Sequence, residues 1–126
     1  MAVFDLNGLK LINDTQGHEA GDACIVEASR FICRQVRHSP VFRIGGDEFV
    51  AILENRDYEN REQLLAGFNR QTEENLREGR EVVIACGLAD YEPGADVGFH
   101  DVFSKADGQM YDRKRALKDM GAYTRE

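Results

Sequence analysis

The sequence of 126 residues contains no tryptophan, only two prolines and only three cysteines, and it has no long apolar run. No Cys-x-x-Cys pair occurs among Cys24, Cys33 and Cys86, which argues against a structural zinc site. We expect all three thiols to lie in the core of a protein from a reducing compartment. No apolar stretch approaches the roughly 20 residues that a membrane-spanning helix needs. The sequence therefore predicts a cytoplasmic domain without membrane contact of its own, which includes the cytoplasmic part of a larger, membrane-anchored protein.

Basic residues are in the minority, because 16 Lys and Arg stand against 23 Asp and Glu, for a net charge of −7. Domains that bind nucleic acid usually carry a basic patch, so we expect no nucleic-acid partner. Lys and Arg do cluster over residues 105–118, but Asp107 and Asp112 lie between them, which is typical of a solvated helix face. The length suffices for one core, and residues 1–126 are predicted to form a single domain.

Two short apolar segments, at 41–44 and 49–53, flank the run Gly-Gly-Asp-Glu at 45–48. This pattern predicts two strands joined by a tight turn, in which Gly45 and Gly46 are free to adopt positive φ. Asp47 and Glu48 place two adjacent carboxylates at the tip of the hairpin. Because side chains alternate along a strand, we expect them on opposite faces, one directed into a site and the other bracing the turn.

A second carboxylate position follows the apolar start of the chain. Residues 1–4 predict a buried strand that ends in Asp5, followed by a loop that opens into a helix. Main-chain N–H groups at a helix start attract phosphate, and Mg²⁺ prefers carboxylates together with phosphate oxygens. If this strand pairs beside the hairpin, Asp5 and Asp47 converge, and metal-assisted nucleotide chemistry is indicated. The alternative is that Asp5 serves only as a helix cap.

The remaining pattern predicts the order of the elements. Strands are expected at about 2–5, 41–45, 48–54 and 81–89, and helices at about 7–15, 20–37, 60–78 and 101–118. The order β-α-α-β-β-α-β-α indicates an α+β domain of the ferredoxin-like, or palm, type. We expect a mixed, mostly antiparallel central sheet flanked by helices, which the pattern places on one face. The helix residues expected to face the core are Ala23, Ile25, Val26, Ala28, Phe31, Ile32, Val36, Leu64, Leu65, Phe68, Leu76, Val102, Phe103, Ala106, Met110 and Tyr111.

Four blocks of the sequence together resemble one family. They are Asp5–Asp14, Gly17–Asp22, Gly45–Phe49 (Gly-Gly-Asp-Glu-Phe) and Lys105–Lys114. In these blocks the chain resembles GGDEF domains, the diguanylate cyclase family, and the resemblance spans residues 3–118. It implies the palm architecture that the element order also predicts. Members of this family usually begin further upstream, with a helix and a Leu-Thr-x-Leu-x-Asn-Arg segment that helps to wall the nucleotide pocket, so we interpret the chain as an N-terminally short GGDEF domain.

The resemblance implies a reaction in which two GTP molecules, one per domain, condense to cyclic di-GMP with release of two pyrophosphates. It implies Mg²⁺ or Mn²⁺ as cofactor, a second GGDEF domain in a homodimer, and an upstream sensory or regulatory domain. One alternative is a catalytically silent GTP-binding GGDEF module that regulates an attached signalling domain. Another is a palm-fold cyclase that acts on a single nucleotide. The intact Asp47 favours the enzyme, because degenerate GGDEF domains usually lose the motif.

The resemblance also assigns the metal and catalytic residues. Asp5, the carbonyl of Leu6 and Asp47 would bind the metal. Asp47 would also help to deprotonate the attacking 3′-hydroxyl, with Glu48 beside it. For Glu48 a structural role is equally compatible with the pattern.

Further residues of the blocks match positions that bind the nucleotide. Asn13 and Asp22 would recognise guanine, since Asp can accept from its N1–H and N2–H₂ groups, although both also fit helix caps. Lys114 and Lys118 lie one helical turn apart and would bind the terminal phosphates, whereas Arg113 is expected to be a bystander.

The glycines and the first loop complete the implied substrate site. The main chain of Gly8 and Leu9, together with Lys10, would contact the β- and γ-phosphates. Gly45 and Gly46 would let the α-phosphate lie against the backbone.

Overall fold

The computed structural model describes residues 1–79, 82–96 and 98–121. Its elements in chain order are β1 (Ala2–Leu6), α1 (Leu9–Gln16), α2 (His18–Gln35), β2 (Val41–Arg43), β3 (Glu48–Ala51), α3 (Asn55–Glu59), α4 (Arg61–Arg77), β4 (Ile84–Leu88) and α5 (Phe99–Asp119). All eight predicted elements are present, with bounds that shift by a few residues. Part of the strand predicted at 81–89 falls on residue 81, which lies outside the described residues. The short helix α3 was missed, because its polar sequence lacks apolar periodicity.

The four described strands form one sheet in the order β2-β3-β1-β4. Every pairing is antiparallel: β1 with β3, β1 with β4, and β2 with β3. The α+β, ferredoxin-like prediction is thus confirmed, but the described sheet is not mixed. The reason is topological, since β1 and β2 run in the same direction yet are separated by β3.

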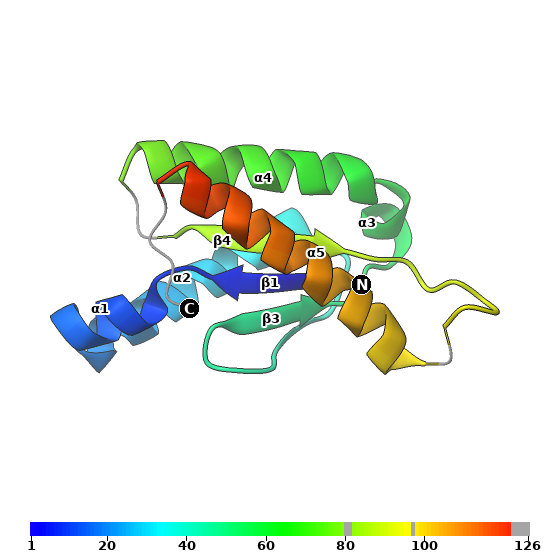
Figure 1. The fold of residues 1–126 in the computed structure, drawn as a ribbon, viewed down its shortest axis with the longest axis horizontal. Coiled ribbons are helices and arrows are strands. Elements are labelled where there is room, and N and C mark those ends of the chain that lie inside the picture. The colour runs from blue at the N-terminus through cyan, green and yellow to red at the C-terminus, as the bar shows by residue number, and fades with distance from the viewer. Residues whose placement is uncertain (80–81, 97, 122–126) are drawn as a thin grey trace.

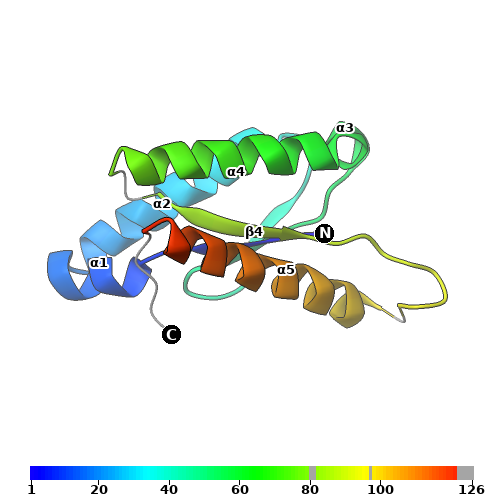
Figure 2. The ribbon, with the colours of Figure 1, turned by 45° about the horizontal axis from the view of Figure 1, so that its top comes forward.

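Helices cover both faces of the sheet, and the expectation of helices on one face is wrong. Figures 1 and 2 show α5 crossing β1 and β4 on one side, while α2 and α4 lie on the other. Alternation along β1 serves both layers: Phe4 packs in the core under α2 and α4, whereas Val3 packs in the core under α5. Because β1 is covered from both sides, all five of its residues are buried.

The helical periodicity identified most core positions but not all of them. Ala28, Phe68 and Met110 are buried as expected, whereas Val26 and Tyr111 are 47% and 50% exposed. Cys24 and Cys86 are buried, and burial raises the pKa of the Cys86 thiol to about 12. Cys33, in contrast, lies exposed on α2, so the prediction of a core thiol is wrong there.

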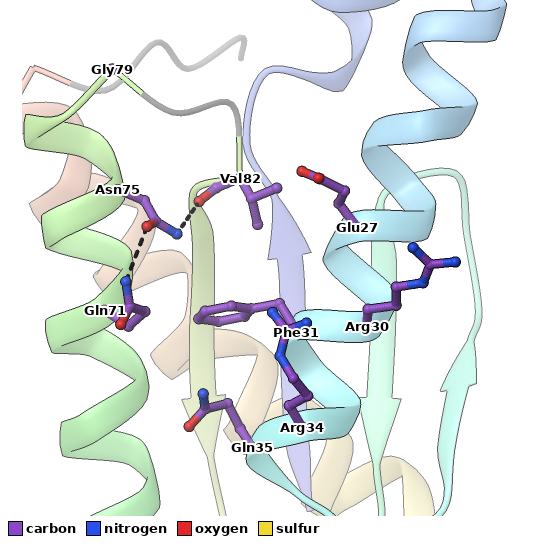
Figure 3. A pocket seen from close by; sticks show the side chains of 9 residues that line it. All are labelled: Glu27, Arg30, Phe31, Arg34, Gln35, Gln71, Asn75, Gly79 and Val82. Atoms are coloured by element: carbon purple, nitrogen blue, oxygen red, sulfur yellow. Dashed lines mark hydrogen bonds between the residues drawn. The ribbon is translucent and has the colours of Figure 1, made fainter.

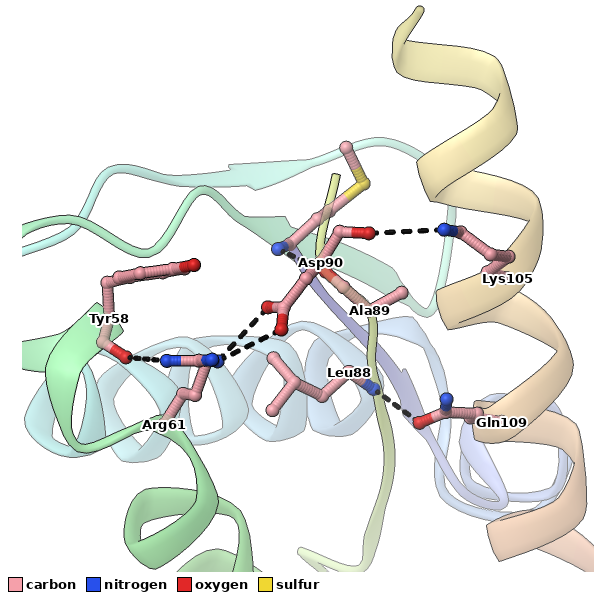
Figure 4. Close-up of polar contacts among 8 residues, drawn as sticks. Tyr58, Arg61, Leu88, Ala89, Asp90, Lys105 and Gln109 are labelled. Atoms are coloured by element: carbon pink, nitrogen blue, oxygen red, sulfur yellow. Dashed lines mark hydrogen bonds and ion pairs between the residues drawn. The ribbon is translucent and has the colours of Figure 1, made fainter. Parts of the chain in front are cut away.

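Polar contacts hold the end of β4 between the two helical layers, as Figure 4 shows. The amide of Leu88 donates to the side-chain oxygen of Gln109 on α5 at 3.3 Å. Arg61 of α4 pairs with the carboxylate of Asp90 at 3.1 Å, and Lys105 of α5 donates to the main-chain carbonyl of Asp90 at 3.1 Å. The segment that follows β4 is therefore linked to both faces.

Within the described residues, no helix combines the length and the apolar composition that crossing a lipid bilayer requires.

The sheet approaches α5 closely at Gly87. A Cβ atom added there would lie well under 3.0 Å from the carbonyl oxygen of Ala106 and the amide nitrogen of Met110. Both of those atoms belong to the helix backbone and cannot rotate away. The absence of a side chain at this position therefore sets how closely α5 approaches β4.

Gly87→Ala is expected to destabilise the fold by about 1–3 kcal/mol, because the helix must move outward to admit the methyl group. Gly108→Ala on α5 is the matched control, since a Cβ there meets nothing within 4 Å. The control should be neutral or stabilising by up to ~1 kcal/mol. Urea unfolding of both variants measures the difference, and equal midpoints would contradict the packing argument.

Candidate functional site

Three carboxylates and one lysine meet at the end of β1. Asp5 is only 6% exposed, and its Oδ2 accepts a hydrogen bond from the ammonium group of Lys114 at 2.9 Å. Glu48 lies directly opposite Asp5 in the β1–β3 register, so both side chains face α5. The amide of Leu6 donates to the carbonyl of Asp47 at 2.8 Å, which places Asp47 beside the same strand end. The predicted convergence of Asp5 with the hairpin carboxylates is therefore observed.

The electrostatics of this carboxylate cluster (Asp5, Asp47 and Glu48) are dominated by burial and by like charge. Burial, with a smaller contribution from Asp47, raises the pKa of Asp5 to about 6 against the opposing effect of Lys114. Burial, followed by the charges of Asp107 and Asp47, raises the pKa of Glu48. Burial acts against the charged form of Lys114, but its hydrogen bond to Asp5 and the nearby carboxylates leave its pKa raised. The single ammonium group of Lys114 therefore faces more negative charge than it can neutralise.

Asp47 and Glu48 do not lie on opposite faces as expected. The strand begins at Glu48, so strand alternation does not apply to Asp47, which interacts with Asp5 on the α5 side of the sheet. Gly45 and Gly46 also differ from expectation, because neither adopts positive φ. A Cβ at Gly46 would meet nothing within 4 Å, and one at Gly45 only the Cβ of Glu48 at 3.8 Å. Within the described residues, neither backbone conformation nor packing requires these two glycines.

The donor set at the end of β1 fits a small divalent cation. Oδ1 of Asp5 is buried and has no hydrogen-bond partner in the described structure. Mg²⁺ is usually held by one or two carboxylates together with phosphate oxygens and water. Across the described residues, no group of three or more His, Cys, Asp and Glu side chains is arranged as a complete metal site. The set of two carboxylates and the Leu6 carbonyl stays a prediction, in which substrate and water would supply the remaining ligands.

The loop between β1 and α1 adopts the conformation that a glycine allows. Gly8 has φ 75° and ψ 12°, in the left-handed region, and α1 begins directly after it. Leu9 is buried and anchors this helix start, whereas Lys10 is exposed beside it. α1 therefore begins only four residues after Asp5, and phosphate binding at its first amides stays a prediction.

Asn13 and Asp22 come from adjoining helices. Asn13 is half-buried on α1, and its carboxamide occupies the space beside Gly21, the residue before Asp22 on α2. Asp22 itself is exposed. The N-cap residues of α1 and α2 are Gly8 and Gly17, so neither Asn13 nor Asp22 caps the start of its helix. Of the helix-terminus caps that the sequence also allowed, N-terminal caps are thus excluded, and the recognition of guanine stays a prediction.

Helix α5 supplies the cationic side of the site. Lys114 is partly buried against Asp5 and lies 5.7 Å from the ring of Tyr111, while Lys118 is exposed one turn further along. Arg113 is not a bystander: it pairs with Glu73 of α4 at 3.2 Å and donates to the carbonyl of Asn69. This contact ties α5 to α4 immediately beside Lys114. Sequence reasoning missed it because the partners lie on a helix 40 residues away in the chain.

A surface groove with a volume of about 760 Å³ lies elsewhere, between α2 and α4 (Figure 3). Arg30 and Arg34 border it from α2, and Gln71 and Asn75 from α4. Asn75 donates to the carbonyl of Val82 at 3.0 Å and accepts from Gln71 at 3.2 Å. None of the residues that line the groove belongs to the predicted site, so its size does not locate the chemistry.

The fold and the site together define a class: a ferredoxin-like domain with three carboxylates and one lysine gathered at the end of its central strand. The family model described as "Diguanylate cyclase, GGDEF domain" matches residues 1–120. The chain belongs to the GGDEF domain family.

Relatives with curated names agree with this assignment. The chain is 32% identical over 115 residues to the bifunctional diguanylate cyclase/cyclic di-GMP phosphodiesterase MucR of Pseudomonas aeruginosa, which covers 88% of the chain and 17% of the relative. It is 33% identical over 132 residues to diguanylate cyclase DgcP of the same organism, covering 94% of the chain and 18% of the relative. The chain thus spans about a fifth of the length of these relatives or less.

Solved structures show the same fold. The active GGEEF domain of a diguanylate cyclase from Vibrio cholerae superimposes with a TM-score of 0.76 at 25% identity, over 96% of this chain and 76% of that one. The GGDEF domain of DgcB from Caulobacter crescentus, solved in complex with c-di-GMP, has a TM-score of 0.70 at 27% identity, over 91% and 71% of the two chains.

The raised pKa of Asp5 predicts a pH-dependent stability. Between pH ~3.8 and ~6 the folded state holds a proton that the unfolded chain has released, so stability falls as the pH rises through this window. Asp5→Asn removes that penalty. In metal-free buffer the variant should exceed the wild type in stability by on the order of 2 kcal/mol above pH ~7.

The advantage should shrink toward zero below pH ~4, where Asp5 is protonated in both states. Chemical unfolding across this range measures it. Lower stability of Asp5→Asn at alkaline pH would show that the Lys114 ion pair outweighs the burial of the charge.

Proposed function

We propose that the domain condenses two GTP molecules to cyclic di-GMP. Each 3′-hydroxyl attacks the α-phosphorus of the other GTP, forming a P–O bond as the bond to pyrophosphate breaks, and the hydroxyl proton passes to a base at the site. The observation that carries the proposal is the meeting of Asp5, Asp47 and Lys114 from segments up to 109 residues apart in the sequence. Two carboxylates for a cation and one ammonium for phosphate are the groups that this transfer needs.

Asp5, Asp47 and the Leu6 carbonyl are the groups that would hold Mg²⁺ or Mn²⁺. The cation, when bound, neutralises phosphate charge and lowers the pKa of the attacking hydroxyl. The partnerless oxygen of Asp5 supports this role, because a buried carboxylate oxygen without a partner is costly. Asp47 is half-buried at the same end and is the candidate to accept the hydroxyl proton, with Glu48 beside it.

The phosphates would lie between α1 and α5. Lys114 and Lys118 share a face of α5. When nucleotide and metal bind, the ammonium group of Lys114 would leave Asp5 and pair with a terminal phosphate. On the other side, the start of α1 offers the amides of Gly8 and Leu9, with Lys10 beside them. The open space at Gly45 and Gly46 supports a close approach of the α-phosphate to the hairpin.

Asn13 and Asp22 would recognise the base. An exposed aspartate can accept from both N1–H and N2–H₂ of guanine, and adenine lacks this pair of donors. The carboxamide of Asn13 complements the same edge from the neighbouring helix. This arrangement would favour GTP over ATP.

The reaction needs two sites that face each other, so we propose a homodimer of this domain as the catalytic form. Since the chain spans a fifth or less of its relatives MucR and DgcP, we also propose an attached sensory or regulatory domain that controls the pairing.

The direct test is product formation. Incubation with GTP and Mg²⁺ or Mn²⁺ should yield cyclic di-GMP, detected by chromatography, with a rate that rises more steeply than linearly with protein concentration. Asp47→Ala should lower the rate by at least ~10²-fold, because it removes a metal ligand and the candidate base. GTP binding without product from the dimerised wild type would instead support the silent regulatory module.

The role of Lys114 is testable by binding. Lys114→Gln should weaken GTP about tenfold or more while leaving GMP nearly unchanged, because only GTP carries the terminal phosphates. Arg115→Gln is the matched control: it removes one positive charge from the adjacent residue, whose side chain is 72% exposed and paired with Asp112. Equal losses in the two variants would indicate only a general effect of charge.

A further inference from the structure

Gly21 is buried near the start of α2, and the space beside it is filled by one particular side chain. A Cβ atom built on Gly21 would overlap the amide oxygen of Asn13 and would lie 2.8 Å from its Cγ, whereas real Cβ atoms keep about 3.0 Å or more. The carboxamide of Asn13 thus occupies the volume that a side chain at position 21 would need.

The backbone does not explain this glycine. Gly21 is helical and is not among the glycines with positive φ. A glycine inside a helix costs about 1 kcal/mol relative to alanine. At two other helical glycines, Gly67 and Gly108, an added Cβ atom would meet nothing within 4 Å, so neither of them provides room for a neighbour. Among Gly21, Gly67 and Gly108, only Gly21 leaves room for a polar group, the carboxamide of Asn13.

The turn between α1 and α2 keeps Asn13 in that place. The amide of Gly17 donates to the carbonyl of Asn13 at 3.1 Å, and the amide of Gly21 donates to the carbonyl of Gly17 at 3.2 Å. These bonds connect the end of α1 to the start of α2 through one residue. The backbone of Asn13 is therefore fixed relative to Gly21, and its side chain is the part that would have to move.

Gly21 directly precedes Asp22 in the sequence, and Asp22 is the second residue proposed to recognise the base. The contact between Asn13 and Gly21 therefore sets where the carboxamide lies relative to the Asp22 carboxylate. We propose that Gly21 is a positioning residue for nucleotide selectivity, which acts through Asn13 by leaving its carboxamide room beside Asp22. The inference rests on the proposed function, in which Asn13 and Asp22 bind guanine.

The test compares the binding of 3′-deoxy-GTP and 3′-deoxy-ATP, which lack the attacking hydroxyl and do not turn over, by isothermal titration with Mg²⁺. Gly21→Ala should reduce the ratio of the two affinities about tenfold, which corresponds to ~1.4 kcal/mol, because the methyl group displaces the carboxamide. Gly67→Ala is the matched control, a helical glycine with open space, and should leave the ratio unchanged. An unchanged ratio in Gly21→Ala would overturn the inference.

A second set of variants separates positioning from general damage to the fold. Asn13→Ala should lose selectivity by itself, and Gly21→Ala added to it should cause no further loss, because the group through which Gly21 acts is already gone. The double variant should also recover the thermal stability that Gly21→Ala loses. A further loss of selectivity in the double variant would overturn the inference, because Gly21 would then act by another route.

Binding of the two nucleotides to the wild type separates a failure of the proposed function from a failure of the role of Gly21. If it binds both nucleotides equally, the proposed recognition of guanine fails, and the inference fails with it. If the wild type prefers the guanine nucleotide and Gly21→Ala preserves that preference, the proposed function stands and only the role of Gly21 is refuted.

Discussion

The ion pair between Asp5 and Lys114 is the interaction around which the rest of the site is arranged. It joins the end of the central strand to the last helix across 109 residues of sequence. The pair is buried, and its carboxylate has further carboxylates as neighbours, so it contributes less to stability than an isolated pair of the same geometry. The apolar layers on both sides of β1 offset that cost. Such a surplus of buried negative charge is what a divalent cation would relieve.

The position of α5 connects packing with chemistry. Close contact at Gly87, the Arg113–Glu73 pair and the hydrogen bond from Leu88 to Gln109 all hold α5 against its neighbours. Lys114 follows Arg113 directly, so these contacts determine how near its ammonium group lies to the sheet. The packing of α5 therefore governs the electrostatics at the end of β1, because it sets the position of the Lys114 ammonium group. A change in this packing changes the electrostatics as well.

The glycines around the site fall into three groups. Gly8 supplies a left-handed backbone at the start of α1, and Gly21 supplies space for the carboxamide of Asn13. Gly45 and Gly46 have neither reason within this chain. The open space at these two glycines leaves room for a ligand to approach the hairpin, which agrees with the nucleotide proposal.

The sequence by itself determined the eight main elements and the α+β class, because periodicity and strand ends are local properties. It predicted the meeting of Asp5 with Asp47 only on the condition that the first strand pairs beside the hairpin, and the tertiary structure supplies that pairing. It did not determine that α5 covers the opposite face, that Asp47 shares a face with Glu48, or that Asn13 packs on Gly21. Cys33 and Tyr111 were misplaced for the same reason, since a helix with apolar residues on two sides does not reveal which side meets the sheet. Only the tertiary structure decides such contacts, because they depend on how whole layers pack and not on the spacing of neighbours along the chain.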